Sequence, residues 1–277
     1  MQQVHPLQPI GVFDSGYGGL TVLKEILKQL PEYDFIYLGD NARAPYGSRS
    51  FETVHEFTLQ CVNKLFDMGC PLVLLACNTA SAKALRTIQQ KDLITMDPSL
   101  RVLGVIRPTT EMIGNMTQTN EVGILGTLGT VNSESYVVEI KKFFPKVKVY
   151  QQACPLWVPI VENNEIDTTT AEQAIKKDID ALLAQSDKID TIVLGCTHYP
   201  LLEHKIRKFL PAGIKLVSQG EIVAKSLRDY LKRHPQMDKR LSKNKQLHFY
   251  TTDSPKNFDE KAGMFFGKKI KSENLGL

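Results

Sequence analysis

Short apolar runs alternate with amphipathic stretches along most of the chain, a pattern that predicts repeated strand–helix units around parallel sheets. The run PLVLLA at residues 71–76 contains no polar position, as expected of a strand buried on both faces. In the first half, apolar runs predict strands at residues 10–14, 35–39, 71–76 and 101–105. Helical periodicity predicts helices over residues 20–30 and 51–68, and helices that begin near Thr79 and Pro108.

The second half of the chain repeats this alternation. Apolar runs predict strands at residues 121–125, 147–151, 191–194, 214–217 and 247–250. Helices are expected from Ser133, as N-cap, to residue 144, over residues 168–185, from about Pro200, and over residues 221–234 and 255–266. Loops are expected at residues 40–50, 153–159 and 235–247. The whole pattern predicts an α/β protein whose mainly parallel sheets are doubly wound.

Two segments far apart in the chain resemble each other. VLLACNT, from Val73 to Thr79, and VLGCTH, from Val193 to His198, each place a cysteine directly after an apolar strand and before polar residues. In open α/β sheets, ligands bind beyond the carboxyl ends of the strands. We therefore expect two similar halves that face each other, each with one cysteine, Cys77 or Cys196, at a shared cleft.

The cysteine count and the N-terminal sequence indicate the compartment. Five cysteines cannot all be paired within the chain. Residues 1–9 lack the basic and apolar regions of a secretory signal, and no apolar run approaches the roughly 18 residues of a membrane helix. We expect a cytoplasmic protein with free thiols and no membrane contact. Cys61, Cys70 and Cys154 are interpreted as structural.

Composition and charge leave an ordinary globular protein. Lys and Arg number 34 against 30 Asp and Glu, a net charge of +4, and 42% of residues are hydrophobic. This excludes collagen-like and wholly disordered chains. The basic stretch at residues 232–245 lacks the interleaved aromatic residues of a nucleic-acid site, so we expect no nucleic-acid partner.

The chemistry expected of Cys77 and Cys196 follows from their place at strand ends. A thiol at the N-terminus of a helix has its thiolate stabilised by the macrodipole and free amides, which makes it a usable base. The alternative is that both are small residues that fill space. Their matching contexts favour a chemical role. Cys196 and His198 do not complete a four-ligand metal set, so no metal is expected.

Polar residues beside the cysteines suit a small charged ligand. The glycine-containing segments at residues 14–19 and 126–130 match neither common nucleotide-binding motif, although their amides would serve a carboxylate equally well. Neutral groups suited to a small zwitterion are Ser15, Asn78, Thr79 and Thr197. Helix capping explains each of these residues taken alone about as well.

Two bases on opposite sides of a small substrate would invert a stereocentre, because one removes a proton and the other supplies one to the opposite face. Asp14 and His198 are the expected proton-handling neighbours of the two thiols. Asp40 and Glu162 are further candidates, with an alternative interpretation as surface or loop carboxylates.

Six motifs between residues 11 and 202 occur in the order found in glutamate racemases, which belong to the cofactor-independent amino-acid racemases. They are GVFDSGYGGLTVLKEI, GDNARAPYGSRS, ACNTASA, GVIRP, ACPLWVPIVE and LGCTHYPLL. The chain resembles this family over a little more than two thirds of its length. One departure follows the strand at residues 214–217, where Ser218 and Gln219 replace the expected Asp-Ser or Asp-Pro pair.

The resemblance implies two α/β domains facing across a cleft, formed by residues 1–107 with 219–277 and by residues 108–218. It implies racemisation of glutamate by Cys77 and Cys196 as the acid/base pair, without pyridoxal phosphate or metal, to supply D-glutamate for peptidoglycan. A homodimer is also expected by family analogy. Asp14 and His198 would assist the thiols, with Asp40 and Glu162 secondary. The implied substrate-binding residues are Asp14, Ser15, Tyr46, Gly47, Asn78, Thr79, Thr197 and His198.

Two other functions remain open from the sequence. One is a related racemase or decarboxylase that acts on aspartate or another small acid. The other is a binding protein with two α/β lobes that holds glutamate without exchanging its Cα hydrogen.

Overall fold

The computed structural model describes residues 8–277, which form two sheets whose paired strands are all parallel. In spatial order, the larger sheet contains β10 (Ser272–Asn274), β9 (Leu247–Thr251), β2 (Phe35–Gly39), β1 (Ile10–Asp14), β3 (Leu72–Leu75) and β4 (Arg101–Gly104). The smaller sheet contains β6 (Lys148–Ala153), β5 (Glu121–Gly126), β7 (Thr191–Gly195) and β8 (Lys215–Val217). The predicted α/β fold is confirmed.

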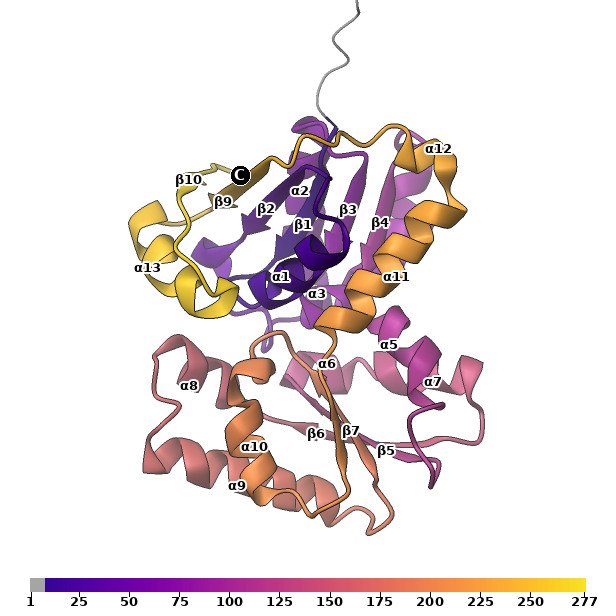
Figure 1. Ribbon diagram of the computed structural model, residues 1–277, viewed down its shortest axis with the longest axis vertical. Helices are drawn as coiled ribbons and strands as arrows, with labels where there is room; N and C mark the ends of the chain where they lie inside the picture. Colours follow the sequence, from indigo (N-terminus) through magenta and orange to yellow (C-terminus); the bar gives the residue numbers. More distant parts are fainter. Residues whose placement is uncertain (1–7) are drawn as a thin grey trace, which may run out of the picture.

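Helices follow most strands, as parallel strand order requires. Around the larger sheet are α1 (Gly19–Gln29), η1 (Asn41–Arg43), α2 (Phe51–Asp67), α3 (Asn78–Lys83), α4 (Leu85–Thr87), η2 (Ile88–Asp92), η3 (Leu93–Thr95), α11 (Gly220–Arg233), α12 (Pro235–Asp238) and α13 (Pro255–Phe266). The remaining helices are α5 (Ile106–Ile113), α6 (Leu128–Asn132), α7 (Ser135–Phe143), α8 (Trp157–Glu162), α9 (Thr169–Leu183), η4 (Tyr199–Leu202) and α10 (Glu203–Phe209). Figure 1 shows the two sheets as separate groups, with α6 near their junction.

Both faces of each sheet are covered, which explains why the central strands have no polar alternation. In β1, Val12 belongs to the core beneath α1 and α11, while its neighbour Phe13 belongs to a second core with side chains of α2. In β7, Leu194 likewise belongs to the first core, while its neighbour Val193 belongs to a third core on the other face. Because adjacent side chains of a strand point to opposite faces, every position of these strands is buried.

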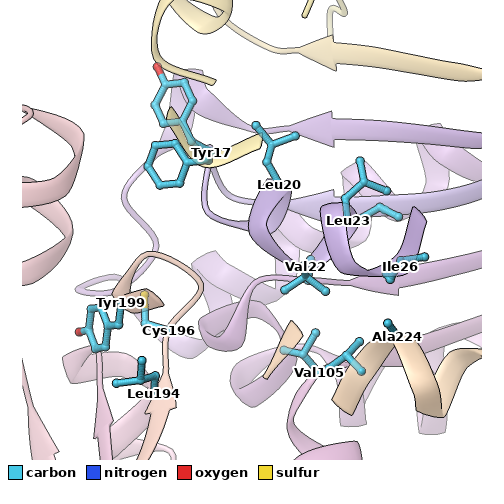
Figure 2. Close-up of a cluster of buried hydrophobic side chains, with 14 of the residues drawn as sticks. Tyr17, Leu20, Val22, Leu23, Ile26, Val105, Leu194, Cys196, Tyr199 and Ala224 are labelled. Carbon is cyan, nitrogen blue, oxygen red and sulfur yellow. The ribbon is translucent and has the colours of Figure 1, made fainter. Parts of the chain in front are cut away.

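One hydrophobic core continues from the larger sheet to the smaller. It runs from Leu20 and Leu23 of α1 to Leu194 of β7 and Tyr199 of η4. Figure 2 shows these side chains, with Cys196 beside Tyr199. Because α1 follows β1 and η4 follows β7, this shared core holds the ends of those two strands near each other.

The chain crosses between the sheets twice. It leaves the larger sheet after β4 through α5, and it returns after β8 through residues 218–219 into α11 (Figure 1). The returning helix packs closely on α1, since an added Cβ at Gly220 would lie 2.9 Å from Cγ of Glu25. This contact fixes the start of α11 against the helix that follows β1.

Several local predictions are wrong. Ser133 does not cap α7: it follows α6, and its Oγ accepts a hydrogen bond from the backbone N–H of Ser135 at 3.2 Å. Glu134 between them has a left-handed φ of 53°, which separates α6 from α7. The expected loops at residues 40–50, 153–159 and 235–247 contain η1, the start of α8, and α12, and the expected terminal helix is followed by an edge strand, β10. No helix among residues 8–277 is long and apolar enough to cross a membrane.

Candidate active site

The carboxyl ends of strands from both sheets converge on one place. Asp14 ends β1, Cys77 follows β3, and Thr197 follows β7. Hydroxyl and carboxyl groups link them: Ser15 Oγ lies 3.4 Å from Cys77 Sγ, and Thr197 Oγ1 donates to Asp14 Oδ2 at 3.5 Å. The two cysteines predicted from the sequence therefore come from facing strand ends.

Cys77 is the N-cap of α3, as its place after an apolar strand predicts. Its sulfur accepts a hydrogen bond from the backbone N–H of Ala80 at 3.4 Å, and only 6% of the residue is exposed. Burial raises the pKa of the Cys77 thiol to about 12, and the Asp14 carboxylate adds to the increase. Hydrogen bonds from Ser15 and Ala80 act in the opposite direction. The net shift favours the protonated thiol of Cys77, against the stabilised thiolate that its place at a helix N-terminus predicts.

Cys196 has a different partner. It lies three residues before η4 and does not cap it, because the N-cap of η4 is His198. Its Sγ is 3.8 Å from Nδ1 of His198, and Nε2 of His198 is 2.9 Å from Oε1 of Glu162. The imidazole of His198 therefore lies between a thiol and a carboxylate, an arrangement that can accept and donate protons.

The environment of His198 favours its protonated form. Burial lowers the pKa of His198, but hydrogen bonding to Cys196 and to Glu162 outweighs it and raises the pKa to about 10. The imidazole is also held by Phe265 of α13, whose ring meets it edge-on at 5.1 Å between centroids. A cation at this position lies 3.8 Å from Sγ of Cys196 through its Nδ1.

The shifted pKa of His198 predicts a pH-dependent stability. The folded state binds the proton more tightly than the unfolded state, whose histidine pKa is about 6.5. The stabilisation is complete below pH 6.5 and is lost as pH rises through about 10. Urea unfolding between pH 6 and pH 10.5 checks this: the wild type loses stability over that range, and Glu162→Gln loses less. An equal loss of stability in the two proteins would contradict the pairing of His198 with Glu162.

Asp14, at the end of β1, is buried at the site. Burial raises the pKa of its carboxyl, and the nearby His198 opposes that increase. Oδ1 accepts a hydrogen bond from the backbone N–H of Gly16 at 2.8 Å, so the side chain has a fixed orientation. Asp14 is electrostatically coupled to Cys77 and to His198, which makes it a group shared by the two halves of the site.

The small polar residues also lie at the junction of the two sheets. Thr79 Oγ1 is 2.9 Å from Oγ1 of Thr127, which follows β5 of the smaller sheet. Asn78 Oδ1 accepts a hydrogen bond from the Tyr136 hydroxyl at 2.8 Å. Both Asn78 and Thr79 are at most 3% exposed, so the first turn of α3 is enclosed by the other half of the molecule.

Asp40, Tyr46 and Gly47 lie on a different side of the site. The Tyr46 hydroxyl donates a hydrogen bond to the Asp40 carboxylate. Asp40 also accepts hydrogen bonds from Arg43 Nε at 2.7 Å and from Thr252 Oγ1 at 2.8 Å. These bonds use the polar atoms of Asp40 and Tyr46 to shape the loop after β2. The carbonyl of Gly47 at its tip accepts from the backbone N–H of Gly129 at 2.7 Å, which joins that loop to α6.

Three residues that build the site were not singled out from the sequence: Gly18 after β1, Thr127 after β5 and Tyr136 of α7. Gly18 approaches the turn after β7 so closely that an added Cβ would lie 2.1 Å from Oγ1 of Thr197 and 2.5 Å from Nδ1 of His198. The paired glycines of residues 18–19 are a sequence signal for such a close approach. Tyr136 has no comparable signal, because a tyrosine on an amphipathic helix also fits a purely apolar core.

No group of three or more His, Cys, Asp or Glu side chains within residues 8–277 is arranged to hold a metal ion. A surface hollow beside Glu162 lies between α8 and α13, and it is lined by Glu162, Asn163, Asn164, Glu260, Lys261 and Met264. Since Glu162 also contacts His198, this hollow borders the buried site on the Cys196 side.

Two parallel sheets, with a buried thiol after a strand of each, are the arrangement expected of an α/β racemase. Residues 10–227 match the model of the Asp/Glu/Hydantoin racemase family. The chain belongs to that family, whose members work without a cofactor, and it is an amino-acid racemase, an isomerase.

Individual relatives agree over almost the full length. A glutamate racemase of Streptococcus agalactiae is 40% identical over 270 residues, which are 98% of this chain and 99% of the relative. The crystal structure of glutamate racemase isoform RacE1 from Bacillus anthracis is 36% identical with a TM-score of 0.88, and it covers 99% of both chains. The glutamate racemase of Francisella tularensis, solved in complex with D-glutamate, is 33% identical with a TM-score of 0.86 and covers 98% of both chains.

Proposed function

We propose that this protein is a glutamate racemase that interconverts L- and D-glutamate by two-base proton transfer at Cα. The observation that carries the proposal is the pair of buried thiols, Cys77 and Cys196, at facing strand ends, each beside its own proton-handling group. Full-length similarity to glutamate racemases supports glutamate as the substrate.

The chemistry balances with two thiols alone. A thiolate takes the Cα proton of glutamate from one face, and the electron pair of the broken C–H bond stays on the carbon as a planar carbanion. The opposite thiol then gives its proton to the other face and becomes a thiolate. The exchange inverts the stereocentre and leaves the first thiol protonated and the second deprotonated. A proton must then leave the first thiol and one must return to the second before the enzyme converts another molecule of the same enantiomer.

The two halves of the site support opposite roles in the resting protein. Burial and the Asp14 carboxylate raise the pKa of Cys77, which keeps its proton available for donation. The protonated imidazole of His198, held by Glu162, stabilises negative charge on Cys196. We propose that the resting enzyme abstracts with Cys196 and donates from Cys77, and that turnover in the other direction requires a proton on Cys196.

Polar groups that follow strands of both sheets would hold the substrate. In the part of the chain that the structure describes, Nδ2 of Asn78 is buried without a hydrogen-bond partner. A buried donor of this kind costs about 1–3 kcal/mol until an acceptor arrives, and a substrate carboxylate oxygen supplies one. We assign the remaining substrate contacts to Asp14, Ser15, Tyr46, Gly47, Thr79, Thr197 and His198.

Donors fixed before the reaction also stabilise the charge that develops on the substrate carboxylate when Cα loses its proton. This stabilisation replaces the electron sink that a cofactor would otherwise provide. We therefore propose that the reaction needs neither pyridoxal phosphate nor a metal ion, and that Asp40 contributes by shaping the loop that carries Tyr46 and Gly47.

The wider assignments follow from the same family. We propose two domains, residues 1–107 with 219–277 and residues 108–218, with the site between them. The crossings of the chain between the two sheets, near residues 105 and 218, support these limits. We further propose a cytoplasmic homodimer that supplies D-glutamate for peptidoglycan.

Incubation with pure L-glutamate in heavy water tests the function. We expect D-glutamate that carries one deuterium at Cα, because the donated proton comes from a thiol that has exchanged with solvent. Chiral chromatography with mass spectrometry reads both the configuration and the label. Unlabelled L-glutamate recovered together with measurable binding would identify a binding protein instead. Labelled and inverted aspartate in a parallel incubation, without labelled glutamate, would reassign the substrate.

A further inference from the structure

Gln219, the departure noted in the sequence, lies where the chain returns to the larger sheet. Its Nε2 donates hydrogen bonds to the carbonyl of Val105 at 3.1 Å and to Oγ1 of Thr109 at 3.0 Å, and the residue is 4% exposed. Val105 and Thr109 belong to the outgoing crossing. The Gln219 side chain therefore ties the two connections between the sheets to each other.

Tyr136 of α7 joins the two halves at the site itself. The residue is fully buried, and its hydroxyl donates to Oδ1 of Asn78 at 2.8 Å. Burial raises the pKa of Tyr136, so the hydroxyl keeps its proton at all ordinary pH values. A hydrogen bond thus joins α7 to the residue after Cys77.

The consequence for Asn78 comes from the chemistry of its amide. An asparagine side chain has an acceptor oxygen and a donor nitrogen on the same carbon, and the terminal torsion between its two orientations is soft. The Tyr136 hydroxyl donates to the Asn78 oxygen, and this hydrogen bond selects the orientation with the oxygen towards Tyr136. The nitrogen then points away from Tyr136, and it is this nitrogen that has no partner within the described residues.

The geometry points to Tyr136 as a positioning residue, which orients the Asn78 amide so that its nitrogen meets the substrate, while Gln219 ties together the two crossings that hold the halves in place. This inference rests on the proposed binding role of Asn78. Because Tyr136 and Asn78 lie in helices that follow strands of different sheets, their bond forms only while the two halves keep this relative position. Substrate affinity is therefore coupled to the arrangement of the halves.

A double-mutant cycle tests the inference with Tyr136→Phe, Asn78→Ala and the combined variant, assayed for kcat and KM with both enantiomers. Tyr136→Phe keeps the ring and removes only the hydroxyl. We expect KM to rise about tenfold, the value of one directed hydrogen bond, while kcat stays within about twofold. The hydrogen bond acts through Asn78, so Tyr136→Phe should add nothing to Asn78→Ala.

The outcomes separate this inference from the function on which it rests. If Asn78→Ala leaves KM unchanged, the binding role of Asn78 is wrong. If Asn78→Ala raises KM but Tyr136→Phe does not, or if the two effects multiply in the combined variant, the positioning role is wrong while racemisation stands. A change in kcat alone would likewise contradict positioning of the substrate.

Two further variants complete the design. Gln219→Leu removes the hydrogen bonds to Val105 and Thr109 that tie the two crossings together, and so loosens the arrangement on which the Tyr136–Asn78 bond depends. We expect a rise in KM without a change in kcat, again absent on the Asn78→Ala background. This variant carries the comparison if Tyr136→Phe does not fold. Tyr33→Phe is the matched control, because the Tyr33 hydroxyl donates to Asp238 at 2.5 Å. Tyr33 lies two residues before β2, at the opposite end of that strand from the site. It should leave KM unchanged.

Discussion

Replacement of either Cys77 or Cys196 by serine should lower the rate of racemisation by about a thousandfold or more while the protein stays folded. Serine has nearly the same shape, so it preserves the packing of a side chain that is only 6% exposed in both positions. Its hydroxyl is a far weaker acid than a thiol and cannot serve as the base or as the matching proton donor. Circular dichroism of the reaction with each enantiomer measures the loss.

The single variants should also differ from each other in a way that a general loss of structure cannot produce. One remaining thiol can still remove the Cα proton from its own face and return a solvent deuteron to the same face. We expect each variant to exchange the Cα hydrogen of one enantiomer with retention, and the two variants to act on opposite enantiomers. A variant that racemises at the wild-type rate would refute the two-base mechanism.

Cys70→Ser and Cys154→Ser are the matched controls. Both thiols are buried, and burial raises the pKa of both. Cys154 Sγ donates to the backbone carbonyl of Gln152 at 3.6 Å, and Cys70 lies in the hydrophobic core beside α2, so neither is expected to act on the substrate. Racemisation should proceed unchanged in both variants. A loss comparable to that of Cys77→Ser would mean that the assay reports folding rather than chemistry.

The sequence predicts the fold well where one strand is buried on both faces. An unbroken apolar run such as that of β3 has few alternatives, and the helix after it begins within one residue of its predicted start. Prediction is poor where short elements depend on distant partners. β10 exists because Ser272 pairs with Phe249 of β9, and α8 begins at a tryptophan packed on Tyr199. Neither contact leaves a local pattern in the chain.

The same distinction holds for the site. Cysteines after apolar strands are visible as a repeat, and the rule that ligands bind at strand carboxyl ends makes their proximity predictable. The groups that act on them from the other sheet are not visible in this way. Tyr136 is 58 residues from Asn78, and its hydroxyl only becomes significant once both helices are in place. The role of Asp40 also depends on the fold, because Arg43, Tyr46 and Thr252 donate hydrogen bonds to its carboxylate.

Gly18→Ala should lower kcat/KM by about a hundredfold or more, although the substitution adds only one methyl group. The new Cβ would lie 2.1 Å from Oγ1 of Thr197 and 2.5 Å from Nδ1 of His198, far inside contact distance. The Thr197 backbone cannot easily retreat, because its carbonyl accepts a hydrogen bond from Thr21 Oγ1 at 3.0 Å. The strain must therefore displace the imidazole from Cys196 or separate the halves of the site.

The measurement must distinguish displacement of the imidazole from loss of the fold. We expect the thermal midpoint of Gly18→Ala to fall by a few degrees only, while the pH profile of kcat changes because His198 no longer faces Cys196. Gly263→Ala in α13 is the control, since the nearest atom to its new Cβ is 3.8 Å away and alanine favours the helix. Wild-type kinetics in Gly18→Ala would show that the two halves stand further apart in solution, and that the contact of His198 with Cys196 does not depend on this close approach.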